Sequence, residues 1–386
     1  MLTLAPGRSL DTLLLLISGA LVFLIVPGVA LFYGAMSGRN AAADAVRAAF
    51  TGAAVVIVLG LVGGYGLIAG PVLVPMFLGR PDWGLASLPT INSHSDPYPL
   101  AHAGFLLALC AVAVAILGAA VASRVTLRAW LVFVVLWSLL VLFPACYTVF
   151  SLDDGWVVAG MHGIDFGGAI PVSLAAGSGA AGVILACGRH GHPPTGVHSL
   201  PLVAAGGALV WVGWFGLALG SEGAVDAFLP LIWVNTLVAS AGGVLIWIVV
   251  DRVLLRRPTI TSALLGAVSG LVAITPAFGV LTPGWSLLLG ALAALACASM
   301  VDVAARARFG VPMTIGVIHI VASLVGLLFV GLFAGGGGMV ESGNFDLFIA
   351  QAVAGLGAAG WSFFVSLAIA LLLRVTIGLT GRRVVV

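Results

Sequence analysis

The feature that most constrains this chain is a series of apolar runs, each about 20 residues long. A helix of this length spans the roughly 30 Å hydrocarbon core of a bilayer. Eleven such runs are predicted, near residues 10–34, 46–70, 100–122, 128–150, 164–187, 199–220, 227–250, 259–277, 282–302, 312–334 and 352–375. Hydrophobic residues make up 62% of the 386 residues and charged residues only 7%, against about a quarter in soluble domains. The sequence therefore predicts an all-α integral membrane protein with eleven transmembrane helices.

The placement of charge between these runs predicts their orientation. Short cytoplasmic loops are enriched in arginine and lysine. Alternate predicted loops contain the arginines, which are Arg39, Arg47, Arg124, Arg189, Arg252, Arg256, Arg257, Arg306, Arg308, Arg382 and Arg383. The opposite loops carry acidic residues with Arg80 as the basic exception, and Glu222, Asp226, Glu341 and Asp346 are interpreted as solvated loop charges there. The pattern predicts an N-terminus outside and a C-terminus in the cytoplasm.

Several other classes of protein and site find no support in the sequence. A net charge of +2 is too small to indicate a nucleic-acid partner. Cysteines 110, 146, 187 and 297 lie in apolar runs at irregular spacing, which favours small packing residues over disulfides or metal ligands. His190, His192 and His198 share one loop without an ordered ligand spacing. We therefore expect no metal, no other cofactor and no enzymatic activity.

Three of the polar residues within the apolar runs are candidate site residues. Asp165 opens the fifth run, Ser173 follows eight residues later, and His319 lies within the tenth. An ionisable group at membrane depth costs roughly 2.5–3.5 kcal/mol on insertion scales, so such a group marks a candidate functional site. Asp165 also has a structural interpretation, because an aspartate before a helix caps free backbone N–H groups. Both interpretations remain open for it.

Four segments resemble the signature segments of the ammonium transporter family (Amt/Mep, related to the Rh glycoproteins). They are residues 27–34 (PGVALFYG), 162–168 (HGIDFGG), 211–216 (WVGWFG) and 273–277 (AITPA), in the order and spacing of that family. The resemblance covers nearly the whole chain as a single membrane domain, 1–386. It implies a homotrimer with one pore in each subunit. It also implies two five-helix halves of opposite orientation, spans 1–5 and 6–10, with span 11 outside them.

The same resemblance implies roles for individual residues. Ammonium would be recruited at an outer mouth by Phe150, Ser221 and Phe105, with Asp165 nearby. Leu109 and Leu217 stand where the family has two stacked gate phenylalanines, so the resemblance implies weaker ammonium capture, because a cation gains about 0.5–2 kcal/mol over an aromatic face. His319 matches the second pore histidine. Ser173 stands in place of the first, and a hydroxyl cannot hold a proton near neutral pH as an imidazole can.

These observations favour an ammonium or ammonia transporter of the plasma membrane that conducts past Ser173 and His319. Two alternatives stay open at this point. One is a non-conducting ammonium sensor or a subunit whose pore has decayed, and the other is a channel for another small solute. The sequence ends at Val386, shortly after the last predicted span, and this short tail argues against the regulation by PII-type signalling proteins known for bacterial relatives.

Overall fold

The computed structural model describes residues 6–88, 96–188, 197–253, 257–306 and 310–380. The predictions for the loop histidines His190 and His192 and for the short tail after residue 380 lie outside these ranges, as do Arg189, Arg256 and Arg308. Within the described residues, eleven helical segments are long and apolar enough to cross a membrane. Each coincides with one of the predicted runs, which confirms the number of spans.

The first five spans are assembled from helices that are interrupted in four cases. The first is α1 (Pro6–Phe23) with α2 (Ile25–Met36), and the third is the continuous α5 (Tyr98–Val121). The second joins α3 (Arg39–Leu59) to α4 (Tyr65–Ala69) through the wide turn η1 (Gly60–Gly64). The fourth joins α6 (Leu127–Trp137) to α7 (Phe143–Phe150) through η3 (Ser138–Leu142). The fifth begins with η5 (Ile170–Leu174) and continues as α8 (Ala175–Cys187).

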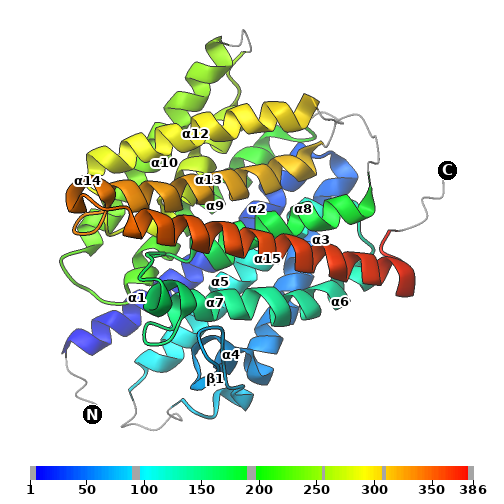
Figure 1. Cartoon of the computed structure of the whole chain (residues 1–386). Coiled ribbons are helices and arrows are strands. Elements are labelled where there is room, and N and C mark those ends of the chain that lie inside the picture. Colours follow the sequence, from blue (N-terminus) through cyan, green and yellow to red (C-terminus); the bar gives the residue numbers. More distant parts are fainter. Residues whose placement is uncertain (1–5, 89–95, 189–196, 254–256, 307–309, 381–386) are drawn as a thin grey trace, which may run out of the picture.

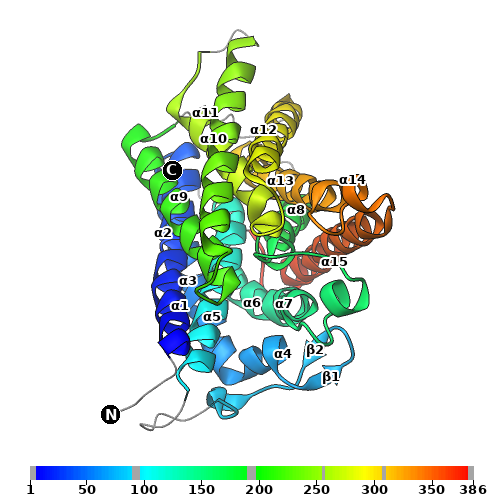
Figure 2. The same cartoon turned by 90° about the vertical axis from the view of Figure 1, so that its left-hand side faces the viewer.

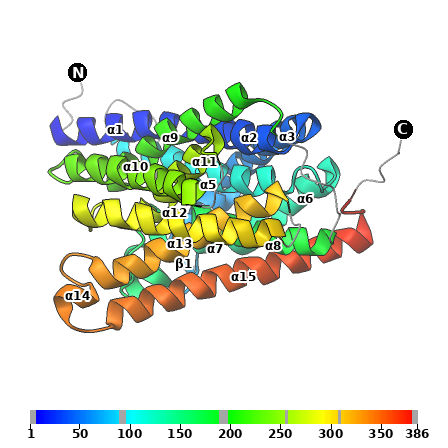
Figure 3. The same ribbon diagram turned by 90° about the horizontal axis from the view of Figure 1, so that it is seen from above.

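The other six spans are more regular. They are α9 (Leu200–Glu222), α10 (Leu229–Val253), α11 (Ile260–Ile274) with the 3₁₀ turn η6 (Thr275–Ala277), α12 (Pro283–Arg306), α13 (Val311–Phe333) and α15 (Asp346–Thr376). The short α14 (Met339–Ser342) precedes α15. The helix α1 begins at one end of the bundle and α15 finishes at the other (Figures 1 and 3). An odd number of crossings produces this arrangement.

Two features position the surface elements. The helix α15 runs across the outside of the bundle over α13, α8 and α6 (Figure 1). A small antiparallel hairpin of β1 (Val72–Val74) and β2 (Leu78–Gly79) lies with α4 beside α7 (Figure 2). The backbone N–H of Met76 in its turn donates to the Asp154 carboxylate at 2.9 Å, and the turn precedes η2 (Trp83–Leu85).

The predicted ends of several spans were wrong, because the helices continue beyond the apolar runs. Arg47 lies inside α3, where it forms an ion pair with Asp44 at 2.8 Å, and Arg252 and Arg306 lie in the last turns of α10 and α12. Glu222, which was interpreted as a loop charge, is the last residue of α9. The fifth span differs in the other direction, since its helix begins at Ile170 and not at residue 164.

Small residues hold the helices close together. A Cβ on Gly243 of α10 would collide with the backbone carbonyl of Gly266 in α11, and a Cβ on Gly290 of α12 would collide with the carbonyl of Ala239 in α10. Because lipid offers no hydrophobic drive for helix association, such backbone approaches supply the van der Waals contact that stabilises the bundle. The α10, α11 and α12 group is built in this way.

Candidate functional site

The segment before the fifth span is held by the carboxylate of Asp165. One carboxylate oxygen accepts a hydrogen bond from the N–H of Ala169 and the other from the N–H of Ile170, each at 2.7 Å. Gly168, which lies between Asp165 and Ala169 in the sequence, has φ of +73°, a conformation that favours glycine. Asp165 is 5% exposed, so its charge is satisfied almost entirely by the helix start that it caps.

The same segment docks on the end of the eighth span. The N–H of Phe166 donates to the carbonyl of Pro276 at 3.2 Å, and the N–H of Gly167 donates to that of Thr275 at 3.0 Å. The hydroxyl of Thr275 accepts a hydrogen bond from the indole N–H of Trp214 at 3.0 Å. Three of the four signature segments noted in the sequence therefore meet in one hydrogen-bonded junction between α9, η6 and the start of η5.

A cavity of about 440 Å³ opens beside this junction. It contains all four residues that the sequence assigned to ammonium recruitment, Phe105 of α5, Phe150 of α7, Ser221 of α9 and Asp165. Residues without a predicted role also line it. These are chiefly Tyr98, His102 and Glu222. Their positions were detectable in the sequence, because His102 precedes Phe105 by one helical turn and Glu222 adjoins Ser221.

The two predicted gate positions lie one helical turn deeper in the bundle. Leu109 follows Phe105 by four residues on α5, and Leu217 precedes Ser221 by four residues on α9. Both side chains have no solvent exposure. Neither residue lines the cavity itself, and both side chains are aliphatic, so they offer no π face to a cation.

The two predicted pore residues are buried further inside. Ser173 of η5 is 0% exposed and His319 of α13 is 1% exposed, and η5 packs on α13. A Cβ on Gly177, one turn after Ser173, would lie 3.0 Å from the Cβ of His319. Ser173 therefore lies one turn from the closest approach of α8 to His319.

Several buried polar atoms lack a hydrogen-bond partner among the described residues, and they include the hydroxyl of Ser173, Nδ1 of His319 and the hydroxyl of Ser323, one turn after His319. The other ring nitrogen of His319, Nε2, lies 3.3 Å from the hydroxyl of Tyr33 on α2. A buried polar atom without a partner costs about 1–3 kcal/mol. Ser173 and His319 are the two residues that the sequence assigned to the pore, and both carry such an atom.

The model of the Ammonium Transporter Family matches residues 13–383. The chain belongs to this family. An ammonium transporter of Mycobacterium tuberculosis is 33% identical over 408 aligned positions, which cover 96% of this chain and 85% of that protein. A putative ammonium transporter of Methanothermobacter thermautotrophicus is 32% identical, with 97% and 94% covered.

Solved structures of the family share the fold. The crystal structure of Mep2 from Candida albicans superposes with a TM-score of 0.86 at 25% identity, and covers 97% of this chain and 86% of that one. A structure described as a sensor Amt protein superposes with a TM-score of 0.88, covers 97% and 96%, and is 21% identical, so it shows the fold alone. Membership of the ammonium transporter family favours transport over the two alternatives left open by the sequence.

Within the described residues, no group of three or more histidine, cysteine, aspartate or glutamate side chains is arranged to hold a metal ion. The polar residues lie at two levels. Ser221 and Asp165 line the cavity, and Ser173 and His319 are buried inside the bundle, beyond Leu109 and Leu217.

Proposed function

We propose that this chain transports ammonium, as ammonia with or without a proton, by a route from the 440 Å³ cavity past Leu109 and Leu217 to Ser173 and His319. Family membership carries the choice of substrate. The observation that carries the route is the pair of partnerless polar atoms, on Ser173 and His319, buried below a cavity that has aromatic and acidic walls.

Physical chemistry decides which species crosses the buried part of the route. Leu109, Leu217 and Ser173 are all 0% exposed, so an ion among them would lose its hydration. Moving an unpaired ion into such surroundings costs tens of kcal/mol in the idealised limit, whereas a neutral hydrogen-bonding molecule loses only a few. Ammonium therefore transfers its proton to bulk water at the cavity, and ammonia passes the leucines to the Ser173 hydroxyl and the His319 ring.

The membrane, the oligomer and the orientation of this route are part of the proposal. We place the chain in the plasma membrane as a homotrimer, with the cavity on the outer face and the C-terminus in the cytoplasm. The arginine bias of one set of loops supports this orientation, and so do the opposite positions of the start of α1 and the end of α15. Packing of α1 and α2 against α9, and of α8 against α13, supports two five-helix halves that meet along their first and last spans.

Reconstitution of the purified protein in lipid vesicles tests the proposal. An inward ammonium gradient should change the internal pH faster than in protein-free vesicles, and methylammonium should compete. Vesicles with the protein should show no added permeability to glycerol, which controls for leakage. Equal ammonium rates with and without protein would refute transport, and selective flux of a different solute would favour a channel for that solute.

A further inference from the structure

The 440 Å³ cavity is lined by a carboxylate, that of Glu222, to which the family resemblance gives no role. We propose that Glu222 is the anionic group that captures ammonium in this chain. This inference rests on the proposed transport function. It concerns how the mouth binds a cation when the gate positions are leucines.

Two acidic side chains line the cavity, Asp165 and Glu222. Both oxygens of Asp165 already accept backbone hydrogen bonds at 2.7 Å, and the residue is 5% exposed. Its carboxylate is therefore committed to the start of η5. Glu222 is half-buried, and it takes part in none of the ion pairs found among the described residues. Unlike Asp165, Glu222 has no backbone hydrogen bond to its carboxylate among the described residues, and its close polar neighbour is the carboxyl group of Asp226.

Ser221 beside it is oriented as an acceptor. Its hydroxyl donates to the carbonyl of Leu217, one turn earlier in α9, at 2.7 Å. A hydroxyl that donates inside its own helix presents only oxygen lone pairs to the cavity. Ammonium carries four N–H donors and no acceptor. Ser221 and Glu222 thus offer adjacent acceptors, and the rings of Phe105 and Phe150 line the same cavity.

The backbone holds Glu222 at this place. The helix α9 ends directly after it, at Gly223, whose φ is +71°. The following loop is tied to α1, because the N–H of Val225 donates to the carboxylate of Asp11 at 2.8 Å. Asp226 in this loop lies within hydrogen-bonding reach of Glu222 and adds a second carboxyl group next to it. The backbone therefore fixes the position of this acidic pair, and because like charges so close repel, the two carboxyl groups share its negative charge.

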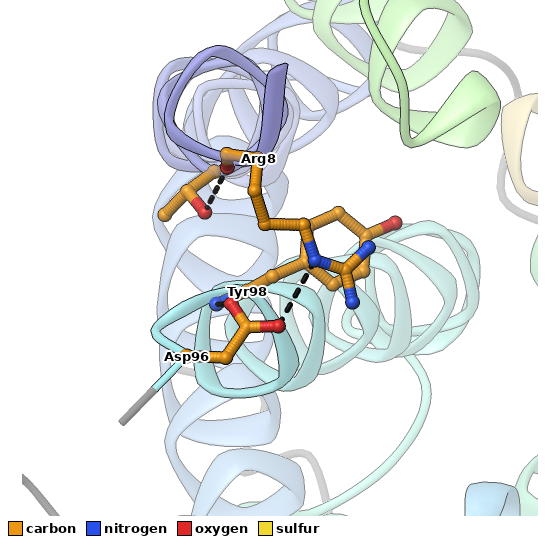
Figure 4. A network of polar contacts seen from close by, with 4 residues as sticks. Arg8, Asp96 and Tyr98 are labelled. Carbon is orange, nitrogen blue, oxygen red and sulfur yellow. Dashed lines mark hydrogen bonds and ion pairs between the residues drawn. The ribbon is translucent and has the colours of Figure 1, made fainter. Parts of the chain in front are cut away.

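Arg8, a cation near the cavity residue Tyr98, is already paired with another carboxylate (Figure 4). Arg8 of α1 donates from Nε to the Asp96 carboxylate at 2.9 Å, and its guanidinium lies 4.3 Å from the centre of the Tyr98 ring. The N–H of Tyr98 also donates to Asp96 at 3.0 Å, and these two donors lower the pKa of the Asp96 carboxyl, so it remains charged at neutral pH. The ring of His102 is nearly parallel to that of Tyr98, 6.1 Å away. Arg8 is thus paired with Asp96 and stacked on Tyr98.

The test compares variants of the full-length protein in vesicles. Glu222→Gln keeps the shape and removes the charge, and we expect the ammonium concentration for half-maximal flux to rise on the order of three- to tenfold, with the maximal rate retained. Glu222→Asp should restore most of the capture. Glu341→Gln is the matched control, because Glu341 is an exposed glutamate of α14 that does not line the cavity.

Ionic strength supplies a second readout that a structural role would not change. Raising salt from about 0.01 M to 0.15 M shortens the Debye length from about 30 Å to about 8 Å. The half-maximal ammonium concentration of the wild-type protein should therefore rise, and its difference from that of Glu222→Gln should become smaller. An unchanged half-maximal concentration in Glu222→Gln, or a change in maximal rate alone, would overturn the inference. A wild-type protein without ammonium flux would instead overturn the proposed function.

Discussion

At the scale of single residues, Asp165 shows how one side chain serves the fold and the route together. Its two oxygens each accept a hydrogen bond from the first backbone N–H groups of the fifth span. Those N–H groups have no other acceptor in a helix that starts there. The carboxylate therefore fixes where the helix begins, and so fixes the position of Ser173, which follows four residues after Ala169.

This role predicts an order of stabilities. Asp165→Ala leaves two N–H groups buried without acceptors and should lower the free energy of unfolding by about 2–6 kcal/mol, at about 1–3 kcal/mol for each group. Asp165→Asn keeps one acceptor, so its free energy of unfolding should lie between those of Asp165→Ala and the wild type. Thermal unfolding of the purified protein in detergent measures the order. Asp346→Ala, at an exposed aspartate in the first turn of α15, is the matched control and should change little. Equal unfolding temperatures for Asp165→Ala and its control would contradict the cap.

At the scale of elements, glycine decides which helices touch. The Cβ that any other residue would add at Gly290 collides with the Ala239 carbonyl, so α10 and α12 approach as closely as their backbones allow. Gly360 of α15 has open space around its added Cβ. The two glycines lie in helices of the same bundle but have opposite surroundings.

Substituting alanine at these two positions should therefore give opposite results. Gly290→Ala forces α10 and α12 apart and should destabilise the protein by about 1–3 kcal/mol, the usual cost of overpacking. Gly360→Ala should be neutral or stabilising by up to about 1 kcal/mol, because alanine has the higher helix propensity. Unfolding temperatures measured side by side check both. A Gly290→Ala protein as stable as the wild type would show that α10 and α12 are not packed as described.

At the scale of the whole molecule, the number of spans could be predicted from the sequence because apolar length alone determines it. The ends of the spans could not. Hydropathy does not distinguish an apolar helix from the non-helical turn at 164–168, and a charge at a helix end such as Glu222 looks like a loop residue. The β1–β2 hairpin was missed for a related reason, because its contacts are with a loop distant in the sequence.

The candidate site could be predicted in part. The residues named for the mouth, Phe105, Phe150, Asp165 and Ser221, line one cavity, although their roles in capture are still predictions. Which acidic group is free could not be deduced from a linear sequence. That depends on the two backbone N–H groups that occupy Asp165, and these become visible only in three dimensions.

The proposed trimer is a further prediction at this scale. Native mass spectrometry of the purified protein should give a species of three times the chain mass of 38.9 kDa, after the mass of bound detergent and lipid is removed. Chemical cross-linking in vesicles provides a check within a bilayer. A protein that is monomeric in both experiments would contradict the trimer while leaving the route within one subunit intact.

The most direct test of the account is ammonium flux through vesicles that hold the wild-type protein or the His319→Ala variant. His319 is 1% exposed, and Tyr33 is the hydrogen-bonding partner of its Nε2. If ammonia passes this ring, its removal should lower ammonium flux on the order of tenfold, the effect of losing about 1.4 kcal/mol of stabilisation along the route. The variant must keep the oligomeric state and unfolding temperature of the wild type. A correctly folded His319→Ala protein with wild-type flux would show that ammonia does not pass His319.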